Sequence, residues 1–433
     1  MQHISTDHVK QTLFASIDSL LSRRDEFLVN PQSSFTRVKK ISFTQTILFP
    51  MVAGADNSST ELLDFFGEEN LPTPSSMVQR RNQIKPEAFS ELFYNFSKNI
   101  PIRNTFCGYQ ILAGDGSRLN LPFDPSNPLT FIQCIEGRKG INQLHMNSLY
   151  DPLNNIFTDI ELQGIHDMNE KEAYTAFLDK YAHTGQKRIY IADRGYASYN
   201  IFAHCIHNEQ LFLIRVPESF AKDICTTCPP CFDDPCVDVE VTVHIGRRDT
   251  KGHNKLENYH CIKSSGHYDF VEARTDGIDR LKIRIMKFPI GENSYEYVVT
   301  NLPSYSFSIQ TIKKLYNLRW GEETAFRHLK YAGNIVHIHS LKNEFLLQEI
   351  YAKLTLYNFS SWLAASIEVT EKKTDKHTYV LNHTQLLKIA IRFIKGTVQE
   401  VKALITKYWV PIRPGRKFKR NIRRQSADTL TYR

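Results

Sequence analysis

Apolar residues in the middle of the chain follow the patterns of β-strands, with two helical segments between them. Strands are expected over 109–114, 129–135, 142–149, 154–162, 188–193 and 211–216. Helices are expected over 170–182 and 199–208. This order of elements predicts a mixed α/β core over 106–216.

Both ends of the chain carry apolar residues at helical spacing instead. Helices are expected over 9–28, 60–67 and 77–84 in the region 1–105, and over 343–368, 383–394 and 397–408 in the region 341–433. Gly67 would end one helix and Thr73 would cap the next, an order typical of a helix-turn-helix that binds DNA through Arg80 and Arg81. A helical hairpin with an exposed basic face fits the same residues.

A segment of alternating residues separates the core from a later helix. Its apolar and polar positions alternate over 237–245 and 281–285, and residues 295–300 are rich in β-branched and aromatic side chains. A compact domain does not hold a structureless loop of this length. We therefore expect a β-rich insertion domain over 217–300, after which the core resumes over 301–340.

Three acidic residues occupy positions suited to metal binding. Asp115 and Asp193 each end an apolar run and are followed closely by Gly, which lets the backbone turn and leaves the carboxylate at the end of a strand. Glu323 belongs to a helical stripe with three other polar residues. At about 100° per residue, the stripe falls on one face of one helix, and its members are Tyr316, Arg319, Glu323 and Lys330.

Two carboxylates at strand ends and one on a helix can share a pair of divalent cations, which is the requirement for metal-assisted attack on phosphodiesters. Mg²⁺ takes oxygen ligands of this kind. Simpler interpretations exist for each part. An Asp-Gly step after a strand is also ordinary turn chemistry, and a charged helical stripe can be a solvated face with pairs four residues apart.

The spacing of Tyr316, Arg319, Glu323 and Lys330 resembles the YREK pattern of DDE transposases from bacterial insertion sequences, in the insertion-sequence-four family. Asp115-Gly-Ser and Asp193-Arg-Gly-Tyr resemble the first and second Asp motifs of that family. The resemblance implies a ribonuclease-H-like core of the retroviral-integrase superfamily, interrupted by a β-rich insertion. It also implies a helical region that binds DNA ends before the core, and adjacent first and fourth strands that carry the two Asp residues.

The resemblance further implies an enzyme that nicks the ends of its element and joins the 3′-hydroxyl to target DNA. Asp115, Asp193 and Glu323 would hold two Mg²⁺ ions, for which Mn²⁺ can substitute, and the partners would be double-stranded DNA and a second copy of the chain. One alternative is a catalytically silent DNA-binding protein derived from such an enzyme, although no acid of the triad is missing. Another is a nuclease of the same fold that acts on RNA or repair substrates, which the helical stripe disfavours.

Charge adds candidates for DNA contact. The 433-residue chain has a net charge of +8, which favours a polyanionic partner. Near the acids, Tyr316, Arg319, Lys330 and Arg194 are candidates for contact with phosphates. The basic run 413–424 could add salt-dependent affinity for DNA or be a solubilising tail; the candidates in it are Arg416, Lys417, Lys419 and Arg420.

The chain begins without a signal pattern, and its longest uncharged apolar stretch, 47–55, is too short to span a membrane. We therefore expect a soluble cytoplasmic protein that associates with the nucleoid and keeps its eight cysteines reduced. Four cysteines lie close enough in sequence for a zinc site, but their proline-rich surroundings favour an unliganded loop. They are Cys225, Cys228, Cys231 and Cys236.

Overall fold

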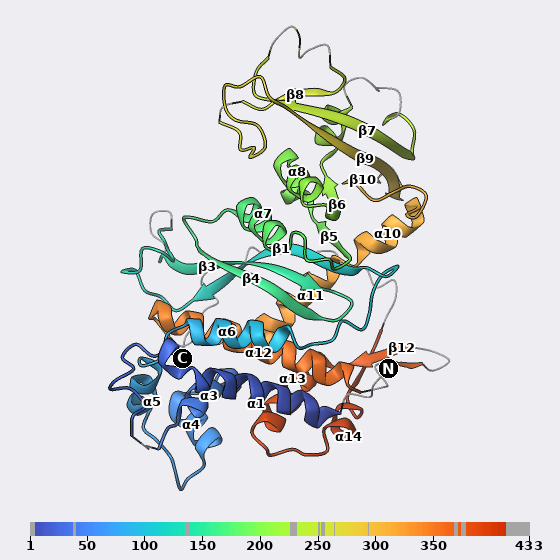
Figure 1. Ribbon diagram of the computed structural model, residues 1–433. Coiled ribbons are helices and arrows are strands. Elements are labelled where there is room, and N and C mark those ends of the chain that lie inside the picture. The colour runs from blue at the N-terminus through green and yellow to red at the C-terminus, as the bar shows by residue number, and fades with distance from the viewer. Residues whose placement is uncertain are drawn as a thin grey trace.

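The computed structural model is a mixed α/β protein built around one large sheet (Figure 1). It describes residues 5–37, 40–134, 139–225, 232–249, 252, 256–263, 265–292, 294–338, 340–367, 371–373 and 378–412. The four cationic candidates of the basic run and two of the four clustered cysteines, Cys228 and Cys231, lie outside these residues. No helix within the described ranges is long and apolar enough to cross a membrane.

Ten strands form the large sheet among the described residues, in the order β2-β3-β1-β5-β6-β10-β9-β7-β8, with β4 paired to β3. The strands are β1 (Gln110–Leu121), β2 (Phe131–Ile132), β3 (Ile141–Asp151), β4 (Ile156–Gly164), β5 (Arg188–Ala192), β6 (Leu211–Val216), β7 (Val237–Gly246), β8 (Tyr259–Cys261), β9 (Ile278–Gly291) and β10 (Ser294–Thr300). A small second sheet contains β11 (Glu371–Lys373), β12 (Thr378–Leu381) and β13 (Trp409–Pro411).

The helices cover this sheet on both faces and form a separate layer below it (Figure 1). They are α1 (Thr6–Ser22), α2 (Arg24–Phe27), α3 (Phe43–Val52), α4 (Ser58–Phe66), α5 (Pro74–Arg81), α6 (Glu87–Ser97), α7 (Glu170–Lys180), α8 (Tyr199–His207), α9 (Glu218–Ile224), α10 (Ile309–Asn317), α11 (Trp320–Arg327), α12 (Asn343–Ala365), α13 (His383–Ile394) and α14 (Val401–Ile405). Of these, α3, α6 and α9 were not expected from the sequence.

The central strands β1, β5 and β6 run parallel to one another, and the predicted adjacency of β1 and β5 is confirmed. Their side chains alternate between two buried faces. Ile111 and Ile189 pack on the face covered by α10, whereas Leu112 and Tyr190 pack on the face covered by α7 and α8. Burial on both faces explains why these strands appear in the sequence as nearly continuous apolar runs.

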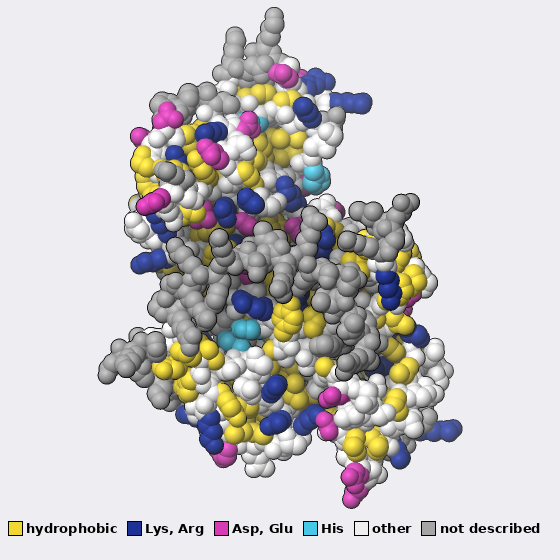
Figure 2. All heavy atoms as spheres, turned by 180° about the vertical axis from the view of Figure 1, so that it is seen from behind, with side chains coloured by type: hydrophobic (Ala, Val, Ile, Leu, Met, Phe, Trp, Pro, Cys, Tyr) yellow, Lys and Arg dark blue, Asp and Glu magenta, His cyan; other side chains and the backbone are white. Residues whose placement is uncertain are grey.

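The segment 217–300, where the sequence predicts a β-rich insertion, is rich in strands, and these continue the large sheet rather than forming a sheet of their own. Strand β10 pairs antiparallel with β6, with Tyr297 opposite Val216, and β9, β7 and β8 continue the sheet outward. Figures 1 and 2 show this part of the molecule projecting beyond the core. Pairing with β10 satisfies backbone groups that would otherwise be exposed along the edge of β6.

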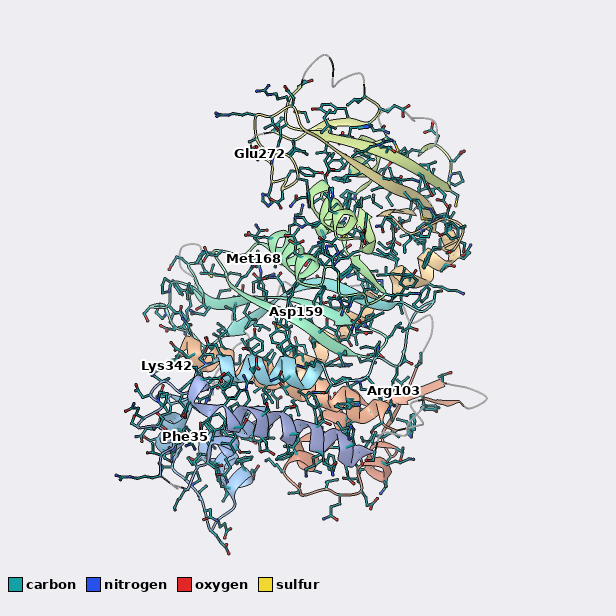
Figure 3. All side chains as sticks on the ribbon, in the orientation of Figure 1. Phe35, Arg103, Asp159, Met168, Glu272 and Lys342 are labelled. Atoms are coloured by element: carbon teal, nitrogen blue, oxygen red, sulfur yellow. The ribbon has the colours of Figure 1, made fainter. Side chains whose placement is uncertain are left out.

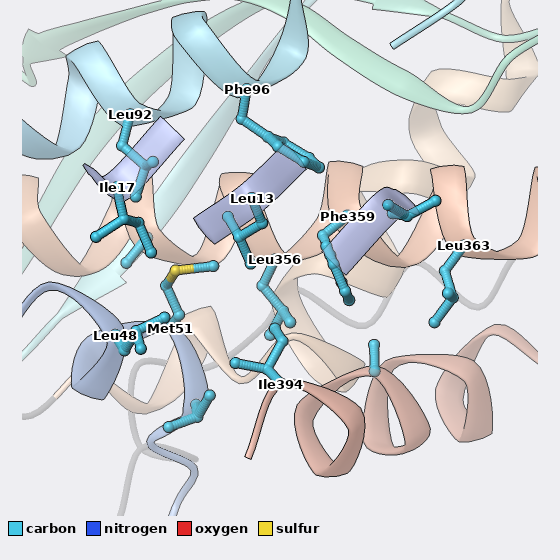
Figure 4. Close-up of a cluster of buried hydrophobic side chains, with 14 of the residues drawn as sticks. Leu13, Ile17, Leu48, Met51, Leu92, Phe96, Leu356, Phe359, Leu363 and Ile394 are labelled. Atoms are coloured by element: carbon cyan, nitrogen blue, oxygen red, sulfur yellow. The ribbon is translucent and has the colours of Figure 1, made fainter. Parts of the chain in front are cut away.

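The two helical regions at opposite ends of the sequence share one hydrophobic core. The long helix α12 is buried on all sides and packs against α1, α3, α6 and α13. Figure 4 shows side chains from these five helices meeting in one cluster, including Leu13, Ile17, Met51, Leu92, Phe96, Leu356, Phe359 and Ile394. Because α12 is buried on every face, it needs partners all round, and the N-terminal helices supply many of them.

Polar contacts tie this helical layer to the sheet. Asp159 of β4, labelled in Figure 3, is almost fully buried and accepts a hydrogen bond of 2.7 Å from the hydroxyl of Tyr94 on α6. Its other carboxylate oxygen lies 2.7 Å from the ammonium of Lys180 on α7. A buried carboxylate is tolerated when it is paired in this way.

Arg81 makes a second link, between α5 and α12. Its guanidinium lies 2.8 Å from a carboxylate oxygen of Glu349 and donates to the side chain of Gln348 at 3.0 Å. It also lies over the ring of Phe345. Arg81, which the sequence predicted to contact DNA, is 7% exposed, and its charge is used inside the protein in this structure.

Arg81→Ala is expected to destabilise the fold by about 3–5 kcal/mol, because it leaves Glu349 buried without its cation. Chemical denaturation followed by circular dichroism would measure the loss. Arg24→Ala is the matched control, because Arg24 is exposed and its ion pair with Asp25 should contribute less than about 1 kcal/mol. Equal stability of the two variants would refute the structural role of Arg81.

Candidate active site

The pairing of β1 with β5 brings two of the predicted acids together. Gly114 lies opposite Ala192 in the parallel ladder, so the next residues, Asp115 and Asp193, are neighbours on adjacent strands. Both side chains point to the face covered by α10, because side chains alternate along a strand. The structure therefore juxtaposes two carboxylates that lie far apart in sequence.

Asp193 lies where the sequence predicted it, but Asp115 does not end its strand. Asp193 directly follows β5 and accepts a hydrogen bond from the backbone N–H of Arg194 at 2.7 Å. Strand β1 instead continues past Asp115, which lies opposite Ser148 of β3. The long antiparallel ladder with β3 keeps β1 extended after its parallel partner β5 has ended, and Asp115 is the first residue beyond that point.

The predicted stripe lies on three consecutive helical segments rather than on one uninterrupted helix. Tyr316 is in α10, Arg319 lies at the junction with α11, Glu323 is in α11, and Lys330 is in the π-helix η4 (His328–Ala332). At the junction, backbone N–H groups bond three residues back, from Leu318 to Leu315 and from Arg319 to Tyr316. The prediction of a single stripe assumes a constant helical period, so it could not include this tighter turn or the wider π-turn that follows it.

Arg319 and Tyr316 connect the helical segments to the acids. The guanidinium of Arg319, 2% exposed, donates to Glu323 Oε1 at 3.1 Å and lies 3.9 Å from Asp115 Oδ2. The hydroxyl of Tyr316 donates to Asp193 Oδ1 at 3.3 Å. The three predicted acids thus lie around Arg319 and Tyr316, two residues of the predicted stripe.

Burial controls the charge of this site. It raises the pKa of Asp115 to about 6; the Gly116 N–H and the Arg319 guanidinium oppose this shift, while Glu323 and Asp193 add to it. Burial also lowers the pKa of the Lys330 ammonium, and the negative charge of Asp115 counteracts that effect. Lys330 therefore belongs to the same electrostatic neighbourhood as the acids.

Two polar residues that the sequence analysis did not single out hold α11 in place. Glu322 is fully buried, and its Oε1 accepts a hydrogen bond of 2.6 Å from the hydroxyl of Ser148 on β3. Burial raises the pKa of Glu322 well above its usual range. The adjacent Glu323 has a side chain that is 35% exposed. The only signal for Glu322 in the sequence was its position next to another glutamate. Glu322 faces the sheet, and Glu323 faces solvent.

Arg215 also belongs to the site and was missed. Because Ala192 pairs with Ile214, Arg215 continues the row of Asp115 and Asp193 on the next strand, and its Nη1 lies 3.8 Å from Asp193 Oδ1. A charged residue within the apolar run 211–216 was the signal that could have identified it.

The remaining predicted DNA contacts differ in position. Arg194 is exposed directly beside Asp193, as a phosphate contact requires. Arg80, the other arginine of this segment that was predicted to contact DNA, is buried like Arg81, and its guanidinium lies 4.4 Å from the centre of the Phe35 ring. The helical pair α4 and α5 therefore does not present these two arginines at the surface.

The raised pKa of Asp115 predicts an effect of pH on stability. Without metal, an Asp115 that resists ionisation in the fold contributes full stability below its unfolded pKa of about 3.8, and this contribution is lost as pH rises through about 6. Asp115→Asn should therefore stabilise the protein in EDTA by about 1–3 kcal/mol at pH 7.5, and by clearly less at pH 4.5. Thermal unfolding at both pH values tests this, and a gain of equal size at both would contradict the shift.

A family profile described as "Transposase DDE domain" matches residues 107–359. A solved cryo-EM structure, a piggyBac transposase synaptic complex with hairpin DNA, aligns with a TM-score of 0.44 and 9% identity, covering 90% of this chain and 77% of that one. No curated protein matches the chain. The family match spans more than half of the 433 residues and includes Asp115, Asp193 and Glu323, so the chain belongs to the transposases with a DDE domain.

Proposed function

We propose that this transposase nicks the ends of an insertion sequence and joins the freed 3′-hydroxyl to target DNA in a cut-and-paste reaction. The observation that carries the proposal is the convergence of Asp115, Asp193 and Glu323 around Arg319 and Tyr316. Water would be the first nucleophile, and the 3′-hydroxyl would attack the target strand at the same site.

The strand order supports a ribonuclease-H-like core for this enzyme. The core strands follow the order β4-β3-β1-β5-β6, in which β4, β3 and β1 are antiparallel and β1, β5 and β6 are parallel. The positions of Tyr316 and Arg319 against the acids support membership of the insertion-sequence-four family with the YREK motif.

The donor chemistry of the site fits divalent metal ions. Among the described residues, no three His, Cys, Asp or Glu side chains are arranged to hold an ion in this structure, and the cation between Asp115 and Glu323 is the Arg319 guanidinium. Carboxylate oxygens are nevertheless the ligands that Mg²⁺ and Mn²⁺ prefer. We propose that Asp115, Asp193 and Glu323 hold two such ions, which when bound would supply Lewis-acid activation of the attacking oxygen and stabilisation of the leaving oxygen.

The other residues of the site would position these ligands and the DNA. Tyr316 orients Asp193 through its hydrogen bond, and Arg319 orients Glu323 while its Nε has no hydrogen-bond partner within the described part of the chain. Lys330 and Arg194 would contact phosphates beside the scissile bond. Lys330 would act as a compact positive charge, and the planar guanidinium of Arg194 could donate two parallel hydrogen bonds.

The partners we propose are double-stranded DNA, at the element ends and at the target in the nucleoid, and a second copy of the chain. The net charge of +8 supports the DNA partner, and the need to handle two ends supports the dimer. A catalytically silent DNA-binding protein would have no need to keep three carboxylates on one partly buried face. The active enzyme is therefore the better interpretation of this geometry.

Asp115→Asn, Asp193→Asn and Glu323→Gln should each lower the rate of end cleavage more than about a hundredfold, because each removes a proposed metal ligand. Cleavage of a labelled DNA fragment that carries the element ends, in Mg²⁺ or Mn²⁺, measures this rate. A gel-shift assay on the same fragment should show end binding within about threefold of that of the unaltered protein.

Glu344→Gln is the matched control, because Glu344 is an exposed carboxylate at the start of α12 and away from the site. It should cleave like the unaltered protein. Undiminished cleavage by any one of the three acid variants would remove that residue from the triad.

A further inference from the structure

Beside the triad, an arginine lies between two carboxylates. Arg215 of β6 has its Nε 3.4 Å from Glu296 Oε1 and its Nη1 3.8 Å from Asp193 Oδ1. The register explains this placement: Val298 of β10 lies opposite Arg215, so Glu296, two residues earlier, projects from the same face. The inserted part of the chain therefore supplies a fourth carboxylate next to the proposed ligands.

We propose that Arg215 competes with divalent metal for Asp193, and that Glu296 holds Arg215 back and so sets the affinity of the site for metal. This rests on the proposed role of Asp193 as a metal ligand. Arg215 is a positioning residue in this scheme, because it acts through Asp193 and makes no bond to the reacting atoms.

The competition follows from charge and distance. A guanidinium keeps its charge at all working pH values, so its attraction to Asp193 opposes the binding of any cation there. Arg215 lies at comparable distances from Glu296 and Asp193, 3.4 and 3.8 Å, so both carboxylates attract its guanidinium. Glu296 has a side chain that is only 13% exposed and Arg215 one that is 28% exposed, so solvent screens this balance less than it would at an open surface.

The arrival of a metal ion at Asp193 would repel Arg215 and leave it paired with Glu296 alone. The guanidinium of Arg215 would then still have a carboxylate partner in Glu296, so no other charge at the site would need to change. Removing Arg215 and removing Glu296 should therefore have opposite effects on metal affinity. Two charges acting independently would also give opposite effects, so the coupling between the two residues is the measurement that tests the proposal.

Mn²⁺ binding to the full chain without DNA, measured by calorimetry or by the electron paramagnetic resonance of free Mn²⁺, tests this. Arg215→Met should tighten binding by about tenfold, and Glu296→Gln should weaken it by a similar factor. Lys313→Met is the matched control: Lys313 also lies near Glu296, but it should change affinity by less than about twofold because it does not pair with Asp193. Arg215→Gln replaces the methionine variant if that variant does not fold.

The double variant separates Arg215-mediated action from direct ligation by Glu296. Glu296→Gln should weaken Mn²⁺ binding at least about threefold more in the presence of Arg215 than in the Arg215→Met background. Equal effects in both backgrounds would overturn the inference, because Glu296 would then act as a ligand or as a simple charge. Asp193→Asn is the reference: if it leaves Mn²⁺ binding unchanged, the proposed function itself fails, whereas weaker binding in Asp193→Asn with an additive cycle refutes only the role of Arg215 and Glu296.

Discussion

The parallel pairing of β1 with β5 is the constraint on which the rest of the site depends. Its register places Asp115 beside Asp193, and a shift by one residue would turn one of the two carboxylates to the opposite face, towards α7 and α8. The apolar residues before each Asp hold this register, because they must fill two buried layers at once. The chemistry of the site is thus set by the packing of residues that take no part in it.

The approach of the helical segments adds the third acid and compensates for its charge. Burial raises the pKa of Asp115, and repulsion from the carboxylates of Glu323 and Asp193 adds to this shift. Arg319 offsets part of this repulsion by lying between Asp115 and Glu323. Glu322 and Ser148 fix α11 against β3, so the helix cannot move away to relieve the repulsion. The fold therefore keeps negative charge concentrated where a divalent cation would be most favourable.

The sequence predicted the features that depend on neighbouring residues. The core strands and the acids that follow apolar runs have local signatures, and so does Glu323 in its helical stripe. The partner of β10, the burial of Arg81 and the proximity of Arg215 to Asp193 depend on contacts between distant segments. No local pattern reports such contacts. The helical breaks around Arg319 and Lys330 were also missed, because the period of the helix changes there.

The inserted strands have a larger part in the site than a separate domain would have. Because β10 completes the edge of β6, its side chains on the α10 face stand next to the row of Asp115, Asp193 and Arg215. Glu296 reaches Arg215 only through this pairing. An insertion that folded on its own sheet could be exchanged without changing the charges around the triad. Here the continuity of the sheet makes the insertion part of the electrostatic environment of the acids. Substitutions of charged residues in β10 should therefore change the electrostatic potential at Asp193.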